Sequence, residues 1–290
     1  MKATLDCLQC MATQALRAAR VATDDPVLQR QVLNEAVKRI SDMDMDESPA
    51  SLSLICYELA AALTGNADPY RALKLEQNEL ALRMEPELRQ IVQESEDRLA
   101  TALHIAAAGN VIDLGTQHAQ NIDVRAALEQ VLRERFAVDH SDAFRESLAH
   151  SKDLVFLLDN AGEIVFDKIL IEELLRYTSV TAVVKAGPII NDALLADAQQ
   201  VGITEICEVI DNGGAFVGSP LDKIPSWFIE RLERADMIVG KGQGNYETVD
   251  VFPGDVFLIL RAKCEVIAAH MGVKYGQVAL ISTRIRRGAS

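Results

Sequence analysis

Hydrophobic positions in the first half of the chain recur every three or four residues, which is the period of an α-helix with one buried face. Two of these segments begin with a polar residue followed by proline, Ser48-Pro49 and Asp68-Pro69, an order that is typical of helix starts. The pattern predicts helices over residues 7–22, 27–40, 48–64, 68–94, 99–108, 124–136 and 142–149.

The pattern changes near residue 150. Short apolar runs now alternate with helical segments, and this alternation is typical of a parallel sheet with crossover helices. The predicted strands cover residues 154–158, 180–184, 205–210, 237–239 and 256–260, and the predicted helices cover residues 164–177, 192–201, 226–234 and 264–271. We therefore predict a helical domain over residues 1–150 and an α/β domain over residues 151–290, packed on each other.

Composition narrows the class of protein. The chain has 290 residues, of which 49% are hydrophobic, and no apolar stretch is long enough to span a membrane. The segment Met1–Asp6 lacks the apolar core of a signal peptide, so we expect a cytoplasmic protein without a membrane partner. A net charge of −14 argues against nucleic acid as a partner. It also means that an anionic substrate needs local positive charge, which a divalent cation and lysines can supply.

Polar side chains follow the predicted strands at the points where they end. Asp159 and Asn160 come directly after the first strand, and Asp192 follows the second. Each segment alone resembles ordinary turn or capping chemistry. Because the carboxyl ends of parallel strands meet at one edge of a sheet, however, we expect these side chains to lie together. Their oxygens, completed by water and substrate, would provide the six positions that magnesium or manganese prefers.

The fourth strand leads into Gly240-Lys241-Gly242-Gln243-Gly244-Asn245-Tyr246-Glu247. Glycines at alternate positions allow a backbone to approach a ligand, and a helix start offers N–H groups to an anion. Lys241 adds a full positive charge. Asn110 and Asp113, which follow the helix over residues 99–108, would reach the same pocket if the helical half covers this edge of the sheet.

The cysteine, histidine and serine patterns argue against several common kinds of functional site. Five cysteines, an odd number, do not indicate a disulfide framework. The pair Cys7-x-x-Cys10 is compatible with two small buried residues or with a metal or redox role, but a structural zinc site would need two further ligands. The histidines show no zinc-ligand spacing, and the serine-hydrolase motif G-x-S-x-G is absent.

Taken in order, these segments resemble the damage-control phosphatase family, first catalogued as domain of unknown function eighty-nine. The motifs that carry the resemblance span nearly the whole chain. They are Cys7-x-x-Cys10, Thr64-Gly65 with Asp68-Pro69-Tyr70, Lys74 with Asn78, Gly109-Asn110-x-x-Asp113, and the segments at residues 159–163, 187–192 and 240–247. The N-terminal C-x-x-C is similar to the prokaryotic branch of that family. The segment at residues 211–218 differs from the Ser-Gly loop of the family, a difference that bears on the choice of substrate.

The resemblance implies a three-layer α/β/α sandwich with a mostly parallel sheet and an N-terminal all-helical domain. It implies metal-dependent hydrolysis of small phosphate esters, such as sugar phosphates or damaged phosphometabolites, with manganese, magnesium, cobalt or nickel as the cation. The implied metal ligands are Asp159, Asn160 and Asp192, and Lys241 would contact the phosphate. We expect Asp159 and Lys241 to be catalytic, and we expect the substrate to be bound by Asn110, Asp113, Glu163, Gly240, Lys241 and Asn245.

Two other functions stay open at this point. A glycine-rich segment on such a sheet also suits an S-adenosylmethionine-dependent carboxyl methyltransferase, an activity that has been proposed for this family. A metal-dependent protein that binds a phosphometabolite without turnover would carry the same residues. The sequence does not decide whether water or Asp159 attacks the phosphorus, nor does it reveal the oligomeric state.

Overall fold

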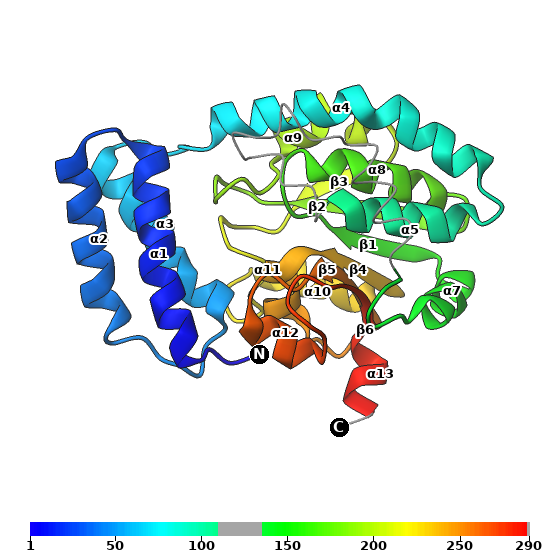
Figure 1. Ribbon diagram of the computed structural model, residues 1–290. Coiled ribbons are helices and arrows are strands. Elements are labelled where there is room, and N and C mark those ends of the chain that lie inside the picture. Colours follow the sequence, from blue (N-terminus) through cyan, green and yellow to red (C-terminus); the bar gives the residue numbers. More distant parts are fainter. Residues whose placement is uncertain (110–134, 289–290) are drawn as a thin grey trace.

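A six-stranded sheet organises the chain, which we describe from a computed structural model over residues 1–109 and 135–288 (Figure 1). The strands are β1 (Asp153–Leu157), β2 (Ser179–Val184), β3 (Glu208–Asp211), β4 (Met237–Lys241), β5 (Val256–Arg261) and β6 (Val278–Ser282). Their order in the sheet is β3-β2-β1-β4-β5-β6. The first five strands run parallel, and β6 pairs antiparallel with β5. The strand order reverses between β1 and β4, so the crevice beyond their carboxyl ends is the place where such sheets bind ligands.

Helices cover both faces of the sheet, and further helices stand at one of its ends. They are α1 (Leu5–Ala22), α2 (Pro26–Ile40), α3 (Pro49–Thr64), α4 (Arg71–Glu94), α5 (Arg98–Gly109), α7 (Ser141–His150), α8 (Glu163–Leu174), α9 (Leu195–Gln200), the 3-10 helix η2 (Ile203–Glu205), α10 (Ser226–Arg234), α11 (Gly242–Val249), α12 (Glu265–Met271) and α13 (Thr283–Gly288). No helix among the described residues is both long and apolar enough to cross a membrane.

The two faces of β1 belong to two different hydrophobic clusters. Leu154 and Phe156 pack with residues of α4, α5, α7 and α8 on one side of the sheet. Val155 and Leu157 pack with residues of α10, α11 and α12 on the other side. This alternation along one strand is the pattern of a sheet buried on both faces. The predicted three-layer α/β/α sandwich is therefore confirmed.

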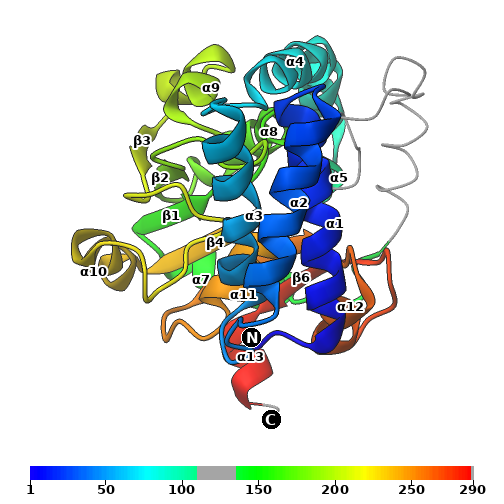
Figure 2. The same ribbon diagram turned by 90° about the vertical axis from the view of Figure 1, so that its left-hand side faces the viewer.

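Helices α1, α2 and α3 form smaller clusters of their own and stand at one end of the sheet (Figures 1 and 2). Local sequence explains their ends. The Asp25 side chain accepts a hydrogen bond from the Val27 N–H at the start of α2, and Ser48 accepts one from Ser51 at the start of α3. Gly65 ends α3 in the left-handed conformation, with φ of 71°. We call α1–α3 the helical cap.

The predicted elements differ from the observed ones in a few places. The third strand begins at Glu208 because η2 occupies residues 203–205, and α9 begins at Leu195 rather than at Asp192. The hydrophobic pattern did not predict strand β6. The helix predicted over residues 124–136 lies almost entirely outside the described residues. Because α4, α5 and α7 share a core with the sheet, that core continues across residue 150, and the division into two domains there stays a prediction.

Candidate functional site

Two backbone hydrogen bonds hold the loop after β1 against the loop after β2. The N–H of Ala193 donates to the carbonyl of Asp159 at 2.8 Å, and the N–H of Ala161 donates to the carbonyl of Asn191 at 2.8 Å. Asn160 and Asp192 therefore face each other as an isolated antiparallel bridge. This arrangement brings together the three residues that the sequence predicted as metal ligands.

The carboxyl groups of this site are buried in a surplus of negative charge. Burial raises the pKa of Asp159 well above its ordinary value, and the neighbouring Glu163 and Asp192 raise it further. Burial also raises the pKa of Asp192, to about 6, although Lys185 opposes the shift. One oxygen of Asp192, Oδ2, has no hydrogen-bond partner among the described residues, and the nearby Lys185 ammonium is 3.7 Å away. A bound cation would relieve the repulsion and provide that missing partner.

The donor set suits a hard cation such as magnesium or manganese because every candidate ligand atom is an oxygen. Within residues 1–109 and 135–288, however, no three histidine, cysteine, aspartate or glutamate side chains form a group that could hold a metal ion. The predicted set has two carboxylates and one amide. The Asn160 amide donates to Asp159 Oδ2 at 2.8 Å and to Glu163 at 3.2 Å, so its oxygen would bind a cation only after the amide turns over. The metal ligands stay a prediction.

Lys241, at the end of β4, is completely buried and uses its ammonium group inside the protein. It donates to Glu163 Oε1 at 2.6 Å, to Asp167 Oδ1 at 2.6 Å and to the carbonyl of Ala106 at 2.8 Å. Burial alone would lower the pKa of Lys241, but the Asp167 and Glu163 carboxylates raise it, so the ammonium stays charged. An ammonium group has three hydrogens, so Lys241 would have to exchange one partner in order to bind a phosphate. Its contact with substrate stays a prediction.

Two further charged residues belong to this site and were not singled out from the sequence. Asp167 lies one helical turn after Glu163 in α8 and shares Lys241 with it. Lys185 follows β2 directly, donates to the carbonyl of Gly218, and lies 3.7 Å from Asp192 Oδ2. Burial lowers the pKa of Lys185, although Asp192 and Asp159 oppose that shift. The position of Lys185 at a strand end was the signal that could have identified it.

The glycine-rich segment places a helix start directly against Asp159. Gly242 begins α11 with φ of 78°, and a Cβ atom there would lie 1.8 Å from Asp159 Oδ2. Only glycine fits that conformation at that distance. Helix α8 begins at Glu163, just after the same aspartate. The positive ends of two helix dipoles therefore meet at the switch point of the sheet, where an anion is favoured.

The other residues predicted to bind substrate occupy different places. Gly240 lies inside β4, where a Cβ atom would be 2.8 Å from the Leu258 side chain. The buried Asn245 donates to the carbonyls of Leu158 and Lys241, at 3.2 and 2.8 Å, and so ties together the ends of β1 and β4. Asn110 and Asp113 lie outside the described residues. A role in substrate binding stays a prediction for all four, and for Glu163 as well.

Helix α4 clamps both loops of the site through the buried Asn78. Its side-chain oxygen accepts the N–H of Gly162 at 2.7 Å, and its amide donates to Asp197 at 2.9 Å and to Gln200 at 2.8 Å. Asp197 in turn accepts the N–H of Leu194, two residues after Asp192, at 2.9 Å. Asn78 was part of the sequence motif, but nothing in the sequence indicated this linking role.

The C-x-x-C pair does not take part in this site. Cys7 is buried and Cys10 is exposed, and all five cysteines are free.

Comparison with known proteins identifies the family of this chain. The family described as damage-control phosphatase ARMT1-like domain matches residues 3–278. A damage-control phosphatase of Pyrococcus horikoshii is 31% identical over 99% of this chain and 100% of its own length. A damage-control phosphatase of Archaeoglobus fulgidus is 32% identical over 96% of this chain and 98% of its own.

A solved structure shares the fold. The crystal structure of a DUF89 family protein from Pyrococcus horikoshii aligns with a TM-score of 0.89 and 30% identity, over 98% of this chain and 99% of that one. The resemblance that the sequence motifs indicated is confirmed. The chain belongs to the damage-control phosphatase ARMT1-like domain family.

Proposed function

We propose that this protein is a metal-dependent phosphatase that hydrolyses small phosphate esters. The observation that carries the proposal is the pairing of the loops after β1 and β2, which gathers Asp159, Asn160 and Asp192 beside the starts of α8 and α11. Oxygen ligands for a cation and positive helix ends for an anion thus meet in one crevice. The names of the Pyrococcus and Archaeoglobus relatives support the same activity.

Asp159, Asn160 and Asp192 would hold the cation, with manganese, magnesium, cobalt and nickel as the candidates. When bound, the metal supplies Lewis-acid stabilisation of a phosphoryl oxygen. The helix starts at Gly242 and Glu163 would face the remaining oxygens of the phosphate. Phosphoryl transfer depends mostly on positioning and on neutralising charge, and these are the tasks that the crevice can perform.

The lysines have different tasks in this proposal. Lys241 holds Glu163 and Asp167 in place and keeps its charge close to the start of α8. Lys185 lies closer to the carboxylates that would bind the metal. Among the described residues its ammonium group contacts the carbonyl of Gly218 and Asp192, so a third N–H can reach a phosphate oxygen. We therefore expect Lys185 to contribute to phosphate binding together with Lys241.

The test is a panel of phosphate monoesters assayed with each of the four metals and after treatment with a chelator. The proposal expects hydrolysis that requires a divalent metal and that is lost in Asp192→Asn. Saturable, metal-dependent binding of the esters without release of phosphate would show a binding protein instead. Tight binding of S-adenosylmethionine without phosphatase activity would show the methyltransferase.

A further inference from the structure

A cavity of about 150 Å³ lies between the helical cap and the loops that follow β2 and β3. Its walls come from α1, from α3, from the segment at residues 67–70 and from the segment at residues 188–190. In Figures 1 and 2 the loops after β2 and β3 extend from the carboxyl end of the sheet toward α1–α3. None of the residues assigned above to the metal or the phosphate lines this cavity, so it is a separate part of the crevice.

One wall of the cavity is continuous with the metal-binding loop. Ile189 and Ile190 line the cavity, and Asp192 follows two residues later. The N–H of Asp192 donates to the carbonyl of Ile189 at 3.1 Å, which folds the segment into a tight turn. A group attached to a phosphate beside Asp192 would therefore have a short path along this turn into the cavity.

The turn carries backbone strain at the position that faces the cavity. Ile190 has a φ of 44°, and it is the one residue other than glycine with a positive φ among those that the structure describes. This region is unfavourable for a β-branched side chain, and such outliers persist where the surrounding structure enforces them. Here the hydrogen bond from Ala161 to the carbonyl of Asn191 fixes the next residue of the turn. The strain therefore couples the shape of the cavity wall to the position of Asp192.

The size and lining of the cavity define what it can hold. An engineered protein cavity of similar volume binds benzene, so about one six-membered ring fits. The walls are mostly apolar, and the lining includes Tyr57 and Tyr70, aromatic residues of a kind that packs well against C–H groups. The charged residues in the described lining are Glu58 and Asp68, both acidic. Lys74 pairs with Asp68 at 3.3 Å and offsets its charge, so Glu58 is the lining carboxylate that disfavours an anion.

We propose that this cavity receives the alcohol part of the phosphate ester and selects leaving groups of about one ring that carry no negative charge. This proposal rests on the proposed phosphatase function. It predicts that monoesters of a single uncharged ring are preferred over bisphosphates, over esters that bear a carboxylate, and over nucleoside monophosphates, whose two ring systems exceed the volume.

The first experiment varies the substrate on the wild-type protein. The substrates form a series in which the size and the charge of the leaving group change separately: methyl phosphate, phenyl phosphate, 4-carboxyphenyl phosphate and 1-naphthyl phosphate. We expect kcat/KM for phenyl phosphate to exceed that for the carboxylated and the naphthyl esters by about tenfold or more, the range over which a pocket discriminates shape. Equal values for the three aromatic esters would overturn the proposal.

The second experiment fills the cavity. Ala61 in α3 lines the cavity, whereas Ala62, the next residue, is exposed and does not. Ala61→Met should raise KM for phenyl phosphate by about tenfold and leave KM for methyl phosphate unchanged, because the methyl group does not reach the filled space. Ala62→Met is the matched control and should change neither value. An equal effect of Ala61→Met on both esters, or no effect on either, would contradict the proposal.

The third experiment reverses a charge without touching the core. Glu58 is exposed at the cavity wall, so Glu58→Lys is expected to fold normally. It should raise kcat/KM for 4-carboxyphenyl phosphate relative to phenyl phosphate by about fivefold, since it replaces repulsion by attraction. Asp24→Lys, an equal charge change at an exposed position of the cap away from the lining, should leave that ratio unchanged.

The outcomes separate this proposal from the phosphatase assignment. If the wild-type protein hydrolyses none of the esters with any metal, the proposed function fails and the cavity proposal fails with it. If it hydrolyses them without regard to size or charge, and the ratios do not respond to Ala61→Met or Glu58→Lys, the phosphatase function stands and the cavity proposal alone is wrong.

Discussion

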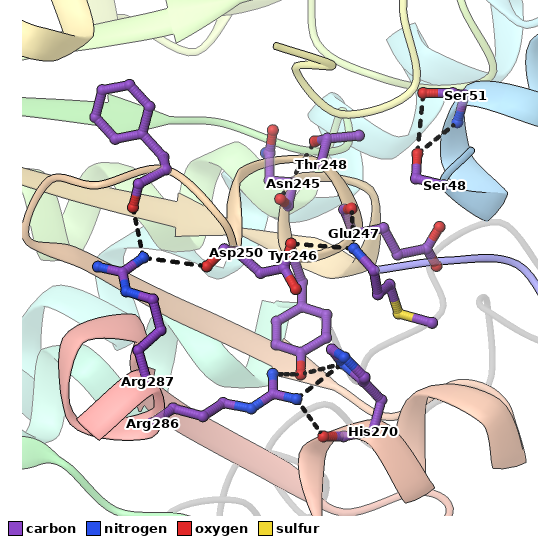
Figure 3. A network of polar contacts seen from close by, with 12 residues as sticks. Ser48, Ser51, Asn245, Tyr246, Glu247, Thr248, Asp250, His270, Arg286 and Arg287 are labelled. Carbon is purple, nitrogen blue, oxygen red and sulfur yellow. Dashed lines mark hydrogen bonds and ion pairs between the residues drawn. The ribbon is translucent and has the colours of Figure 1, made fainter. Parts of the chain in front are cut away.

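The two ends of α11 lie in polar networks of opposite character. At its start, four buried carboxylates share two lysines; the carboxylates are those of Asp159, Glu163, Asp167 and Asp192, and the lysines are Lys185 and Lys241. Toward its end, the Tyr246 hydroxyl meets His270 Nδ1 at 2.9 Å, and Arg286 contacts both of them (Figure 3). Arg286 also donates to the carbonyl of His270 at 2.6 Å.

The difference between the networks bears on where the proposed chemistry would take place. The network around Tyr246 joins the hydroxyl, the His270 ring and carbonyl and the Arg286 guanidinium, so its components stabilise the fold as they stand. The network around Asp159 has more buried negative charge than its lysines can balance, and such a surplus costs stability unless a further cation binds. A metal ion should therefore stabilise the first network and leave the second unaffected. The predictions below test that contrast.

The largest effect is expected from Asp159→Asn. The variant removes the buried charge but keeps the shape, so activity with manganese should fall by about 100-fold or more. Because the repulsion with Glu163 and Asp192 also disappears, the metal-free variant should melt at the same temperature as the wild type or higher. Thermal melts should show that metal stabilises the wild type, by about 2.7 kcal/mol at 100 times the Kd, and no longer stabilises the variant.

The matched control is Asp211→Asn. Asp211 is an exposed aspartate at the end of β3, on the same edge of the sheet, and its side chain caps the N–H of Gly213 at 2.8 Å. Asparagine preserves that cap, so activity and metal response should remain those of the wild type. Near-wild-type activity in Asp159→Asn would show that the carboxylate surplus has no catalytic meaning.

Gly242→Ala should produce the next largest effect. Its Cβ atom would lie 1.8 Å from Asp159 Oδ2, so the carboxylate or the start of α11 must move. A shift of about 1 Å at a reacting centre can cost up to roughly 100-fold in turnover. Gly272→Ala is the matched control, because its φ of 74° is equally unfavourable for alanine but nothing lies within 4 Å of the added atom.

Both glycine variants should lose about 1–2 kcal/mol of stability from the left-handed backbone. Only Gly242→Ala should lose metal-dependent activity, and chemical denaturation together with phosphate-release assays measures the two effects separately. Equal activity losses in the two variants would mean that backbone strain alone explains the result, and that the contact with Asp159 has no role.

The parts of this site that the sequence could predict are those that depend on local order. Asp159, Asn160 and Asp192 each follow an apolar run, and parallel strands bring such ends to one edge whatever the details of packing. Helix starts such as Ser48-Pro49 are similarly local, because the cap and the proline act on the first turn. These features needed no knowledge of distant contacts.

The parts that the sequence could not predict depend on contacts between distant segments. Lys241 was expected at a phosphate, yet its three acceptors come from α5 and α8, and one of them is the backbone carbonyl of Ala106. The sequence around Lys241 would be the same whether the lysine binds a phosphate or these internal acceptors. Asn78 likewise contacts Gly162, 84 residues away, and no periodicity records such a pairing. The missed β6 is a short apolar run whose antiparallel pairing with β5 is also a tertiary property.

Asn78→Ala should have an intermediate effect on stability and on metal-dependent activity, because the Asn78 side chain joins the two loops of the site to α4. The N–H of Gly162 and one oxygen of Asp197 would lose a buried partner, at a cost of about 1–3 kcal/mol in the free energy of unfolding. If Asn78 positions the loops for metal binding, the metal concentration needed for half-maximal activity should rise, while kcat at saturating metal changes less. A loss of stability with an unchanged metal requirement would show a purely structural role.

Tyr246→Phe should affect only stability. The variant leaves His270 Nδ1 and Arg286 without the hydroxyl partner, which should cost about 1 kcal/mol because the site is partly exposed. Metal-dependent activity should remain within about twofold of the wild type, and the stabilisation by metal should be unchanged. A loss of activity comparable to that of Gly242→Ala would show that the two ends of α11 are coupled.

The smallest expected effect is a dependence of stability on pH at the Tyr246 network. Burial and the nearby Arg286 lower the pKa of His270 below its ordinary 6.5, so the folded state favours the neutral ring. The unfolded chain then binds more protons near that pH, and the stability contributed by His270 is present above pH 6.5 and lost as pH falls below it. Glu247, one residue after Tyr246, contributes with the opposite sign.

Burial raises the pKa of Glu247 from 4.5 to about 7, so its contribution is present at low pH and is lost as pH rises toward 7. The two groups oppose each other in one pH window, and Asp167 and Asp192, whose pKa values burial raises to about 7 and about 6, add to the contribution of Glu247 there. His270→Gln removes only one of them. Subtracting the variant curve from the wild-type curve cancels Glu247, whose pKa is not shifted by His270. The difference then reports His270 together with the effects that Arg286, Asp250 and the N-terminal ammonium group have on it. This difference in unfolding free energy should fall as pH drops from 7 to 5. A difference that is constant over that range would show that His270 has the same pKa in the folded and unfolded states. The contacts of His270 in this network would then be weaker than its geometry indicates.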